Sequence, residues 1–152
     1  MTLREGERAQ LVAWARGALP CEACGLLVGS AVDGAAAEDS HVVSRVTLSR
    51  NLAGADGRTR FVLDPAHWVR MEEEASRQGL GVIGVWHSHP GEKAAMVGAE
   101  PSARDAAGAL PGWSYLIISI DDSEGACLRS WRMSPEAGGA APMLEERIIA
   151  SS

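Results

Sequence analysis

The chain has 152 residues, 46% of them hydrophobic and 22% charged, with a formal net charge of -6. This length is enough for one domain with a hydrophobic core but short for two, so we expect a single domain over residues 1–152. The acidic balance, without any cluster of lysines and arginines, argues against a nucleic-acid partner. The apolar runs are far shorter than the roughly 20 residues of a membrane span, and the charged N-terminal segment lacks the apolar stretch of a signal peptide, so we expect a cytoplasmic protein with no membrane partner.

The first third of the chain predicts one helix followed by a hairpin. Residues 2–5 (TLRE) have the form of a capping box, and apolar residues then recur at helical spacing until Pro20, so we expect a helix between these points. Residues 26–28, between two glycines, are typical of a short buried strand, and residues 41–48 alternate well enough for a second strand. A turn at Gly34 would join the two strands into a hairpin.

The middle of the chain predicts a loop, a short strand, a helix and a longer strand. Polar residues and glycines over 51–60 indicate a loop, and residues 61–63 indicate a short strand. The Asp-Pro pair at 64–65 is a strong helix start, and Gly79 ends that helix. The apolar run that follows predicts a strand over residues 82–89.

The last third predicts one short helix and three strands. In chain order we expect a glycine-rich loop, a helix beginning near Ser102, strands over 114–120 and 126–133 joined by a turn at 121–125, a linker over 134–142, and a final strand around 146–149. Helices and strands mix without strict alternation, so the fold class is α+β or mixed α/β, with a sheet layered with helices.

Two of the four histidines, His87 and His89, stand at the end of the predicted strand over 82–89. Side chains in a strand alternate between faces, so the two imidazoles would project to one side, together with Ile83 and Val85. That face would run from apolar core to paired imidazoles, which is the geometry of two metal ligands on a rigid element. An isolated H-x-H is also compatible with two half-exposed histidines hydrogen-bonded to their neighbours.

A third ligand for a metal stands downstream, at Asp105. Zinc that does chemistry usually keeps three protein ligands and an open position, and a carboxylate oxygen can be the third ligand. The pattern from Ser102 to Asp105 is also that of a helix capping box. The two interpretations are compatible, because an aspartate in the first turn of a short helix can face both its own cap and a metal.

A hydrolytic metal site also needs a general base. Glu22 is a candidate, because it lies at the mouth of the predicted strand over 26–28, whereas acids such as those at 72–74 are typical of a solvated helix face. By spacing alone, Glu22 is one of several candidates. The cysteines are expected as thiols, although Cys21 and Cys24 with the two histidines would form an alternative, closed structural zinc site.

Four motifs together resemble the JAMM metallopeptidases, whose domain is the metal-binding MPN domain. The motifs are P-x-E-x-C-G-L-L-x-G at 20–29, R-F-x-x-D-P at 60–65, H-S-H-P at 87–90 and P-S-x-x-D at 101–105. The resemblance covers residues 3–131, which is most of the chain. It implies the MPN fold, which is cytidine-deaminase-like, with a curved mixed β-sheet flanked by helices.

The resemblance also implies a zinc enzyme that cleaves peptide or isopeptide bonds at the C-terminal tail of ubiquitin or ubiquitin-like proteins. Carried over to this chain, His87, His89 and Asp105 would bind Zn²⁺, and Glu22 would be the acid and base acting on water. Ser102 would donate a hydrogen bond to the developing oxyanion. The compact chain is similar to prokaryotic single-domain members, which favours a small modifier or sulfur-carrier protein, cleaved after its Gly-Gly, as substrate. Removal from a lysine side chain, trimming of a carrier's C-terminus and release of cysteine from a carrier all remain open.

The chain departs from the family pattern between His89 and Asp105, where residues 90–104 form a longer segment than is usual. Loop-closure entropy rises slowly with length, so the site can survive this insertion. The extra 91–98 segment can be a flap over the metal, a subunit contact in a homodimer, or a hinge that exchanges the Ser102 helix between protomers. A catalytically silent scaffold of the same fold, which binds protein partners, is the alternative function.

Overall fold

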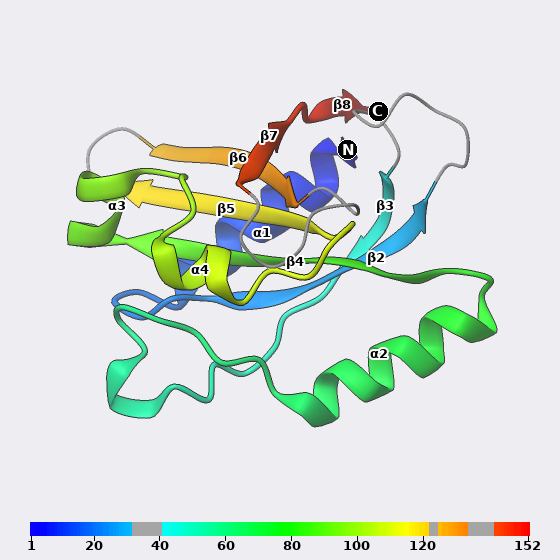
Figure 1. Cartoon of the computed structure of the whole chain (residues 1–152), viewed down its shortest axis with the longest axis horizontal. Helices are drawn as coiled ribbons and strands as arrows, with labels where there is room; N and C mark the ends of the chain where they lie inside the picture. The colour runs from blue at the N-terminus through cyan, green and yellow to red at the C-terminus, as the bar shows by residue number, and fades with distance from the viewer. Residues whose placement is uncertain (32–40, 122–124, 134–141) are drawn as a thin grey trace.

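The computed structural model of the chain describes residues 1–31, 41–121, 125–133 and 142–152 (Figure 1). The strands are β1 (Thr2–Arg4), β2 (Cys24–Ala31), β3 (His41–Val46), β4 (Gly81–Pro90), β5 (Ser114–Asp121), β6 (Gly125–Met133), β7 (Met143–Glu146) and β8 (Ile149–Ser151). The helices are α1 (Glu5–Gly17), the 3-10 helix η1 (Gly54–Asp56), α2 (Pro65–Arg77), α3 (Gly91–Val97) and α4 (Ala103–Ala107). The turn expected at Gly34, the tip of the 121–125 turn and nearly all of the 134–142 linker lie outside the described residues.

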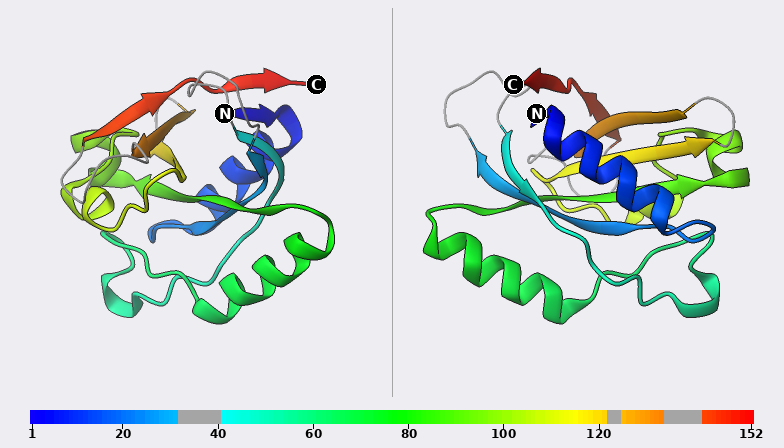
Figure 2. Two further views of the ribbon diagram at one scale, coloured as in Figure 1. Left: turned by 45° about the vertical axis from the view of Figure 1, so that its right-hand side comes forward. Right: turned by 180° about the vertical axis from the view of Figure 1, so that it is seen from behind.

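The strands form one mixed, curled sheet in the order β7-β6-β5-β4-β2-β3-β1-β8. Strands β4 and β5 are parallel, as are β1 with β3 and β1 with β8, and the other neighbours are antiparallel. Strands β7 and β8 stand at opposite ends of this order, yet only residues 147 and 148 separate them in the chain. The sheet therefore curls until its two edges come close, as Figure 2 shows. The predicted mixed α/β class with a curved sheet is confirmed.

Helices cover both faces of the sheet. Helix α1 crosses one face, where Leu11 and Ala15 are buried and Trp14 stacks on Trp86 of β4 at 6.0 Å between ring centroids (Figure 2). Helix α2 lies against the other face, where Ala75 packs with residues of β2, β4 and β5. None of the helices in the described ranges combines the length and the apolar character needed to span a bilayer.

The connection between β4 and β5 determines where the site lies. Parallel neighbours require a crossover, and this one, residues 91–113, contains α3 and α4. Helix α3 therefore follows directly from the carboxyl end of β4, where the two histidines stand, and α4 comes later in the same connection (Figure 1). In open α/β sheets, ligands bind outside the carboxyl ends of the strands, and in this chain His87 and His89 lie at the carboxyl end of β4.

A bulge in β4 changes which side chains share a face. The pairing of β2 with β4 shifts register between Leu27 and Val28, which leaves Ile83 as the extra residue of β4. Ile83 packs in the core under α1, whereas Val85 packs in the core under α2, on the face that leads to His87. The expectation that Ile83 would share this face was therefore wrong, because a bulge reverses the alternation that an uninterrupted strand would keep.

The helix start predicted at residues 2–5 was also wrong. Residues Thr2–Arg4 form β1, which pairs with β3 and β8, and α1 begins at Glu5 with no side-chain cap at Arg4. Sheet pairing on both sides satisfies the backbone of β1 and buries Leu3, so tertiary contacts override the local capping pattern.

Of the other local expectations, one helix start is confirmed and three segments differ from what was expected. The predicted start of α2 is confirmed, because the Asp64 carboxylate accepts from the Ala66 N–H at 2.9 Å and Pro65 opens the helix. Residues 61–63 form no strand and contribute one isolated bridge, between Leu63 and Asn51. The 91–98 segment, expected as a loop, contains α3, and the expected final strand is two short strands, β7 and β8.

Candidate metal centre

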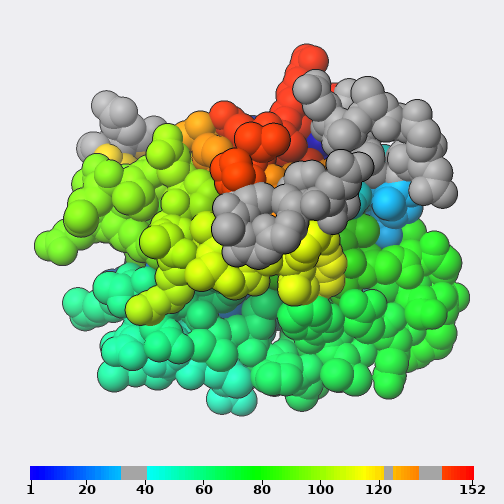
Figure 3. All heavy atoms as spheres, viewed as in Figure 1, coloured from blue at the N-terminus to red at the C-terminus, as the bar shows by residue number. Residues whose placement is uncertain are grey.

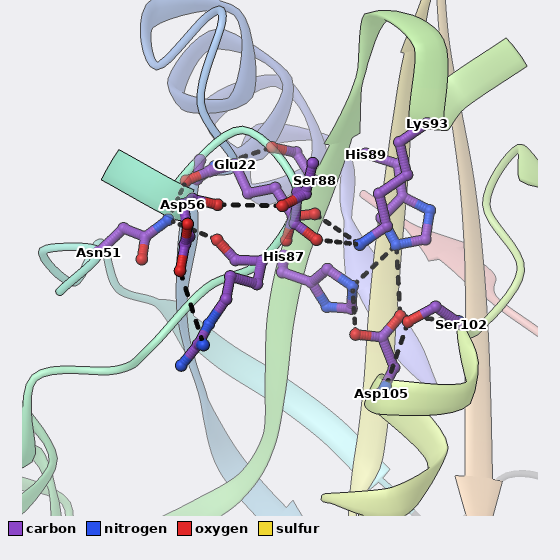
Figure 4. A network of polar contacts seen from close by, with 12 residues as sticks. Glu22, Asn51, Asp56, His87, Ser88, His89, Lys93, Ser102 and Asp105 are labelled. Carbon is purple, nitrogen blue, oxygen red and sulfur yellow. Dashed lines mark hydrogen bonds and ion pairs between the residues drawn. The ribbon is translucent and has the colours of Figure 1, made fainter. Parts of the chain in front are cut away.

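Three metal-ligating side chains converge at the end of β4. The Nε2 atoms of His87 and His89 lie 3.0 Å apart. Asp105, in the first turn of α4, brings its Oδ1 to 3.3 Å from the His87 Nε2 and its Oδ2 to 3.4 Å from the His89 Nε2 (Figure 4). Among the residues that the structure describes, these three form the group of histidine, cysteine and carboxylate side chains that could hold a metal ion.

The spacing of these atoms fits a small divalent cation. Ligands at about 2.0 Å from a tetrahedral zinc ion lie about 3.3 Å from one another, and the three measured separations are 3.0, 3.3 and 3.4 Å. The side chains are 0 to 7% exposed, so an ion held there would be largely shielded from solvent. Two imidazoles and one carboxylate suit zinc and other first-row divalent metals.

Neighbouring groups orient both imidazoles. The His89 Nδ1 lies 2.8 Å from the Gly98 carbonyl oxygen, which can only accept, so Nδ1 carries the proton and Nε2 keeps its lone pair. The ring of Phe61 stacks on His87 at 4.5 Å between centroids. The 91–98 segment therefore supplies a partner to one ligand, and the segment before α2 packs on the other.

The electrostatics favour the metal-binding forms of His87 and Asp105. Burial lowers the pKa of His87, and the neighbouring Asp105 only partly offsets this effect, so the imidazole is neutral. Burial alone would raise the pKa of Asp105, but the contacts of its carboxylate with His87, His89 and Ser102 hold that pKa well below its ordinary value. Neutral imidazoles and an ionised carboxylate are the forms that bind metals.

Asp105 also caps its own helix. Its Oδ2 accepts from the Ser102 N–H at 2.7 Å, and the Ser102 Oγ accepts from the Asp105 N–H at 3.2 Å. This is the capping box predicted for α4, so the two interpretations of Asp105 hold together. Because Ser102 Oγ serves as an acceptor in the box, its own O–H remains able to donate.

Glu22 lies buried beside the histidine pair, just before β2. Its backbone N–H donates to the Gly57 carbonyl at 2.7 Å, and its carbonyl accepts from the Asn51 amide at 3.0 Å. Its carboxylate Oε1 lies 2.5 Å from Lys93 Nζ, and its Oε2 is buried without a hydrogen-bond partner among the described residues (Figure 4). The 51–57 loop therefore holds the backbone of Glu22, and α3 holds its side chain.

The structure brings His87, His89 and Asp105 together, with Glu22 and Ser102 beside them (Figure 4), and adds three residues that sequence reasoning missed. Lys93 contacts the candidate base Glu22, whereas Gly98 and Phe61 each contact a candidate ligand. One signal for Lys93 was present, because it is the chain's single lysine. Helix α3 packs on β4 and β5, so the 91–98 segment is part of the domain rather than a free flap. Asp105 reaches the histidines of its own chain, and no exchange between protomers is required.

Two hollows adjoin the site. One of about 460 Å³ opens at His87 and Asp105, between α4 and the residues before α2 (Figure 3). Its apolar lining consists of Phe61, Leu63, Trp68, Val85, Leu110 and Tyr115. The other hollow, of about 430 Å³, lies at Leu19 and Pro20. Thr59 and Lys93 line both hollows. A larger hollow of about 530 Å³ lies against β6 and the end of the chain and contains none of the candidate site residues.

The alternative site with Cys21 and Cys24 is not formed within the described ranges. Neither cysteine belongs to the converging group. Burial, together with the charge of Glu22, raises the pKa of the Cys24 thiol to about 12, so this side chain is a neutral thiol.

Comparison with known proteins identifies relatives over nearly the whole chain. A family model described as prokaryotic homologs of the JAB domain matches residues 5–134. A protein of Desulfitobacterium hafniense with a known solution structure is 32% identical, covering 99% of this chain and 92% of its own, with a TM-score of 0.78. One from Salinibacter ruber is 26% identical, covering 99% and 90%, with a TM-score of 0.66. A JAB1/MPN domain protein from Archaeoglobus fulgidus is 19% identical, covering 98% and 99%, with a TM-score of 0.50, and so shares the fold. Among proteins with curated descriptions, none matches.

Proposed function

Because the chain belongs to the prokaryotic homologs of the JAB domain, within the JAMM/MPN family, we propose that it is a zinc-dependent peptidase or isopeptidase. Its substrate would be a ubiquitin-like modifier or sulfur-carrier protein, cleaved after the C-terminal Gly-Gly. The observation that carries the proposal is the convergence of His87, His89 and Asp105 at tetrahedral spacing, with the buried carboxylate of Glu22 beside them.

In this proposal His87, His89 and Asp105 hold the zinc ion. When bound, zinc supplies Lewis-acid chemistry, which lowers the pKa of water and polarises the carbonyl of the scissile bond. The orientation of His89 by Gly98, and of Asp105 by its capping box, keeps the ligands in place before the ion arrives.

Glu22 and Ser102 would handle the proton and the developing charge. The unpartnered Oε2 of Glu22 accepts the proton of the attacking water and later delivers it to the leaving amine, a role typically worth about 10²- to 10⁴-fold in rate. The O–H of Ser102 donates to the oxyanion that develops on the scissile carbonyl. No covalent intermediate with the protein is needed.

The hollows support an extended tail as substrate. A chain that crosses from one hollow to the other passes Thr59 and Lys93, which line both. Glycines have no side chain and suit such a passage, and an extended tail can add beside strands through its backbone. The proposal covers both peptide and isopeptide bonds, because the chemistry at the carbonyl is the same.

Cleavage of defined fusions tests the proposal. Zinc-loaded protein is incubated with carrier proteins extended beyond their Gly-Gly, and the products are read by intact mass. We expect cleavage after Gly-Gly, its loss with a chelator, and its reduction by at least about 100-fold in Glu22→Gln with zinc still bound. Equal cleavage by the wild type and Glu22→Gln would remove the assigned base. Stable binding of a carrier without cleavage would favour the silent scaffold instead.

A further inference from the structure

The carboxylate of Glu22 has an ion-pair partner that the family motifs do not include. Lys93, in the first turn of α3, places its Nζ 2.5 Å from Glu22 Oε1 and 3.4 Å from the Thr59 carbonyl oxygen (Figure 4). The Glu22 side chain is fully buried, and that of Lys93 is 17% exposed. Within the described part of the chain, Lys93 is the one side chain that hydrogen-bonds this carboxylate.

The contact engages the two carboxylate oxygens unequally. Lys93 holds Oε1, whereas Oε2 is buried without a partner among the described residues. The backbone of Glu22 is already held by Gly57 and Asn51, so the side-chain torsions are the freedom that remains. A charge-assisted hydrogen bond at one oxygen restricts those torsions and leaves the other oxygen to accept a proton.

Helix α3, which contains Lys93, is packed against the sheet. It begins at Gly91, directly after β4, buries Ala94, and packs on β4 and β5. The residue after its last turn, Gly98, supplies the carbonyl that orients His89. The same inserted segment therefore contacts both the candidate base and a candidate ligand.

We propose that Lys93 is a positioning residue for Glu22, which keeps Oε2 directed at the reacting water. This proposal rests on the proposed hydrolytic function. The opposite role, in which Lys93 blocks the base as a latch, predicts that removing the amine increases activity. The two roles therefore differ in the sign of one measurement.

Kinetics of three variants test the role. Lys93→Ala is expected to lower kcat about 10- to 100-fold with KM changed less than about 3-fold, and Lys93→Arg is expected to restore part of the loss. Met96→Ala is the matched control, because Met96 lies on the same helix and is 82% exposed, and its kinetics are expected to be unchanged. An unchanged or increased kcat in Lys93→Ala overturns the proposal. A loss of kcat accompanied by loss of zinc or of the folded state also overturns it.

A double-mutant cycle checks that Lys93 acts through Glu22. In the Glu22→Gln background, Lys93→Ala is expected to have no further effect on kcat, because the group that it positions is already absent. A further loss of the same size as in the wild-type background would show an independent role and overturn the proposal.

A readout without substrate separates this inference from the proposed function. The ¹³C signal of the Glu22 carboxyl carbon, identified by its absence in Glu22→Gln, is expected to be shifted and broadened in Lys93→Ala and unchanged in Met96→Ala. If wild-type protein cleaves no fusion, the proposed function fails while this signal still reports on positioning. An unaltered signal in Lys93→Ala refutes the positioning itself.

Discussion

Replacement of Asp105 separates its observed helix capping from the metal ligation that we propose for it. In Asp105→Asn the side-chain oxygen can still accept from the Ser102 N–H, as Oδ2 does at 2.7 Å, but the negative charge is lost. The amide nitrogen then takes the place of Oδ1, which lies 3.3 Å from the His87 Nε2. An amide nitrogen can donate a hydrogen bond to that imidazole, but it has no lone pair with which to bind a cation. Asp105→Ala removes both the ligand and the cap acceptor.

The magnitudes follow from linkage between metal binding and folding. At a free zinc concentration of 100 times Kd, binding stabilises the folded state by about 2.7 kcal/mol. For a chain of 152 residues, 1 kcal/mol corresponds to about 2–4 °C in Tm, so the wild type is expected to gain about 5–11 °C. A ligand loss that weakens binding 100-fold leaves about 0.4 kcal/mol, or about 1–2 °C, at the same zinc concentration.

Thermal unfolding with and without zinc is the assay. Without metal, both variants are expected to melt below the wild type, because the ionised carboxylate of Asp105 stabilises the folded state. Asp105→Ala is expected to melt about 2–4 °C below Asp105→Asn, because in the alanine variant the Ser102 N–H also loses a hydrogen bond worth about 1 kcal/mol. With metal, neither variant is expected to show the full wild-type shift. A wild-type zinc shift in Asp105→Asn would refute the assignment of Asp105 as a ligand.

Two further predictions concern the fold. A Cβ at Gly84 would lie 2.2 Å from the backbone carbonyl oxygen of Ser114, so Gly84→Ala is expected to lower the free energy of unfolding in urea by at least about 3 kcal/mol. A Cβ at Gly81, in the same strand, meets nothing within 4 Å, so Gly81→Ala is the control and is expected to cost less than about 1 kcal/mol. Equal costs for the two variants would refute this packing. Burial lowers the pKa of His41 to about 4 in the folded protein, below its ordinary value of 6.5. Stability is therefore full above pH 6.5 and falls as pH decreases towards 4, by at most the ~1.4 kcal/mol per pH unit that linkage to one proton allows. The free energy of unfolding of His41→Asn, measured over the same pH range, is expected to lack this component, and parallel pH profiles would contradict it.

Sequence reasoning succeeded where the signal is local. The start of α2 at Asp64 and Pro65 and the capping box at Ser102 depend on groups within one helical turn, and both are present. It failed at residues 2–4 and 91–97, where β1 pairs with distant strands and α3 packs on the sheet. These segments carry weak or misleading local patterns, and their structure is decided by contacts with the rest of the chain.

The candidate site shows the same difference between features that follow from local spacing and features that do not. Strand alternation alone put His87 and His89 on one face, since their side chains are two residues apart on a single element. The residues by themselves left Glu22 as one acid among several, and the family resemblance singled it out.

The sequence by itself therefore determined the candidate ligands, which are a pair of histidines on one strand and an aspartate in a helix cap. These features depend on spacing within one element, which acts over a few ångströms of backbone. Only the tertiary structure decided that Lys93 contacts Glu22, 71 residues away, and that a bulge at Ile83 reverses the face of β4. Such contacts arise from strand register and from the packing of a crossover onto the sheet, and neither is encoded in the pattern of a single segment.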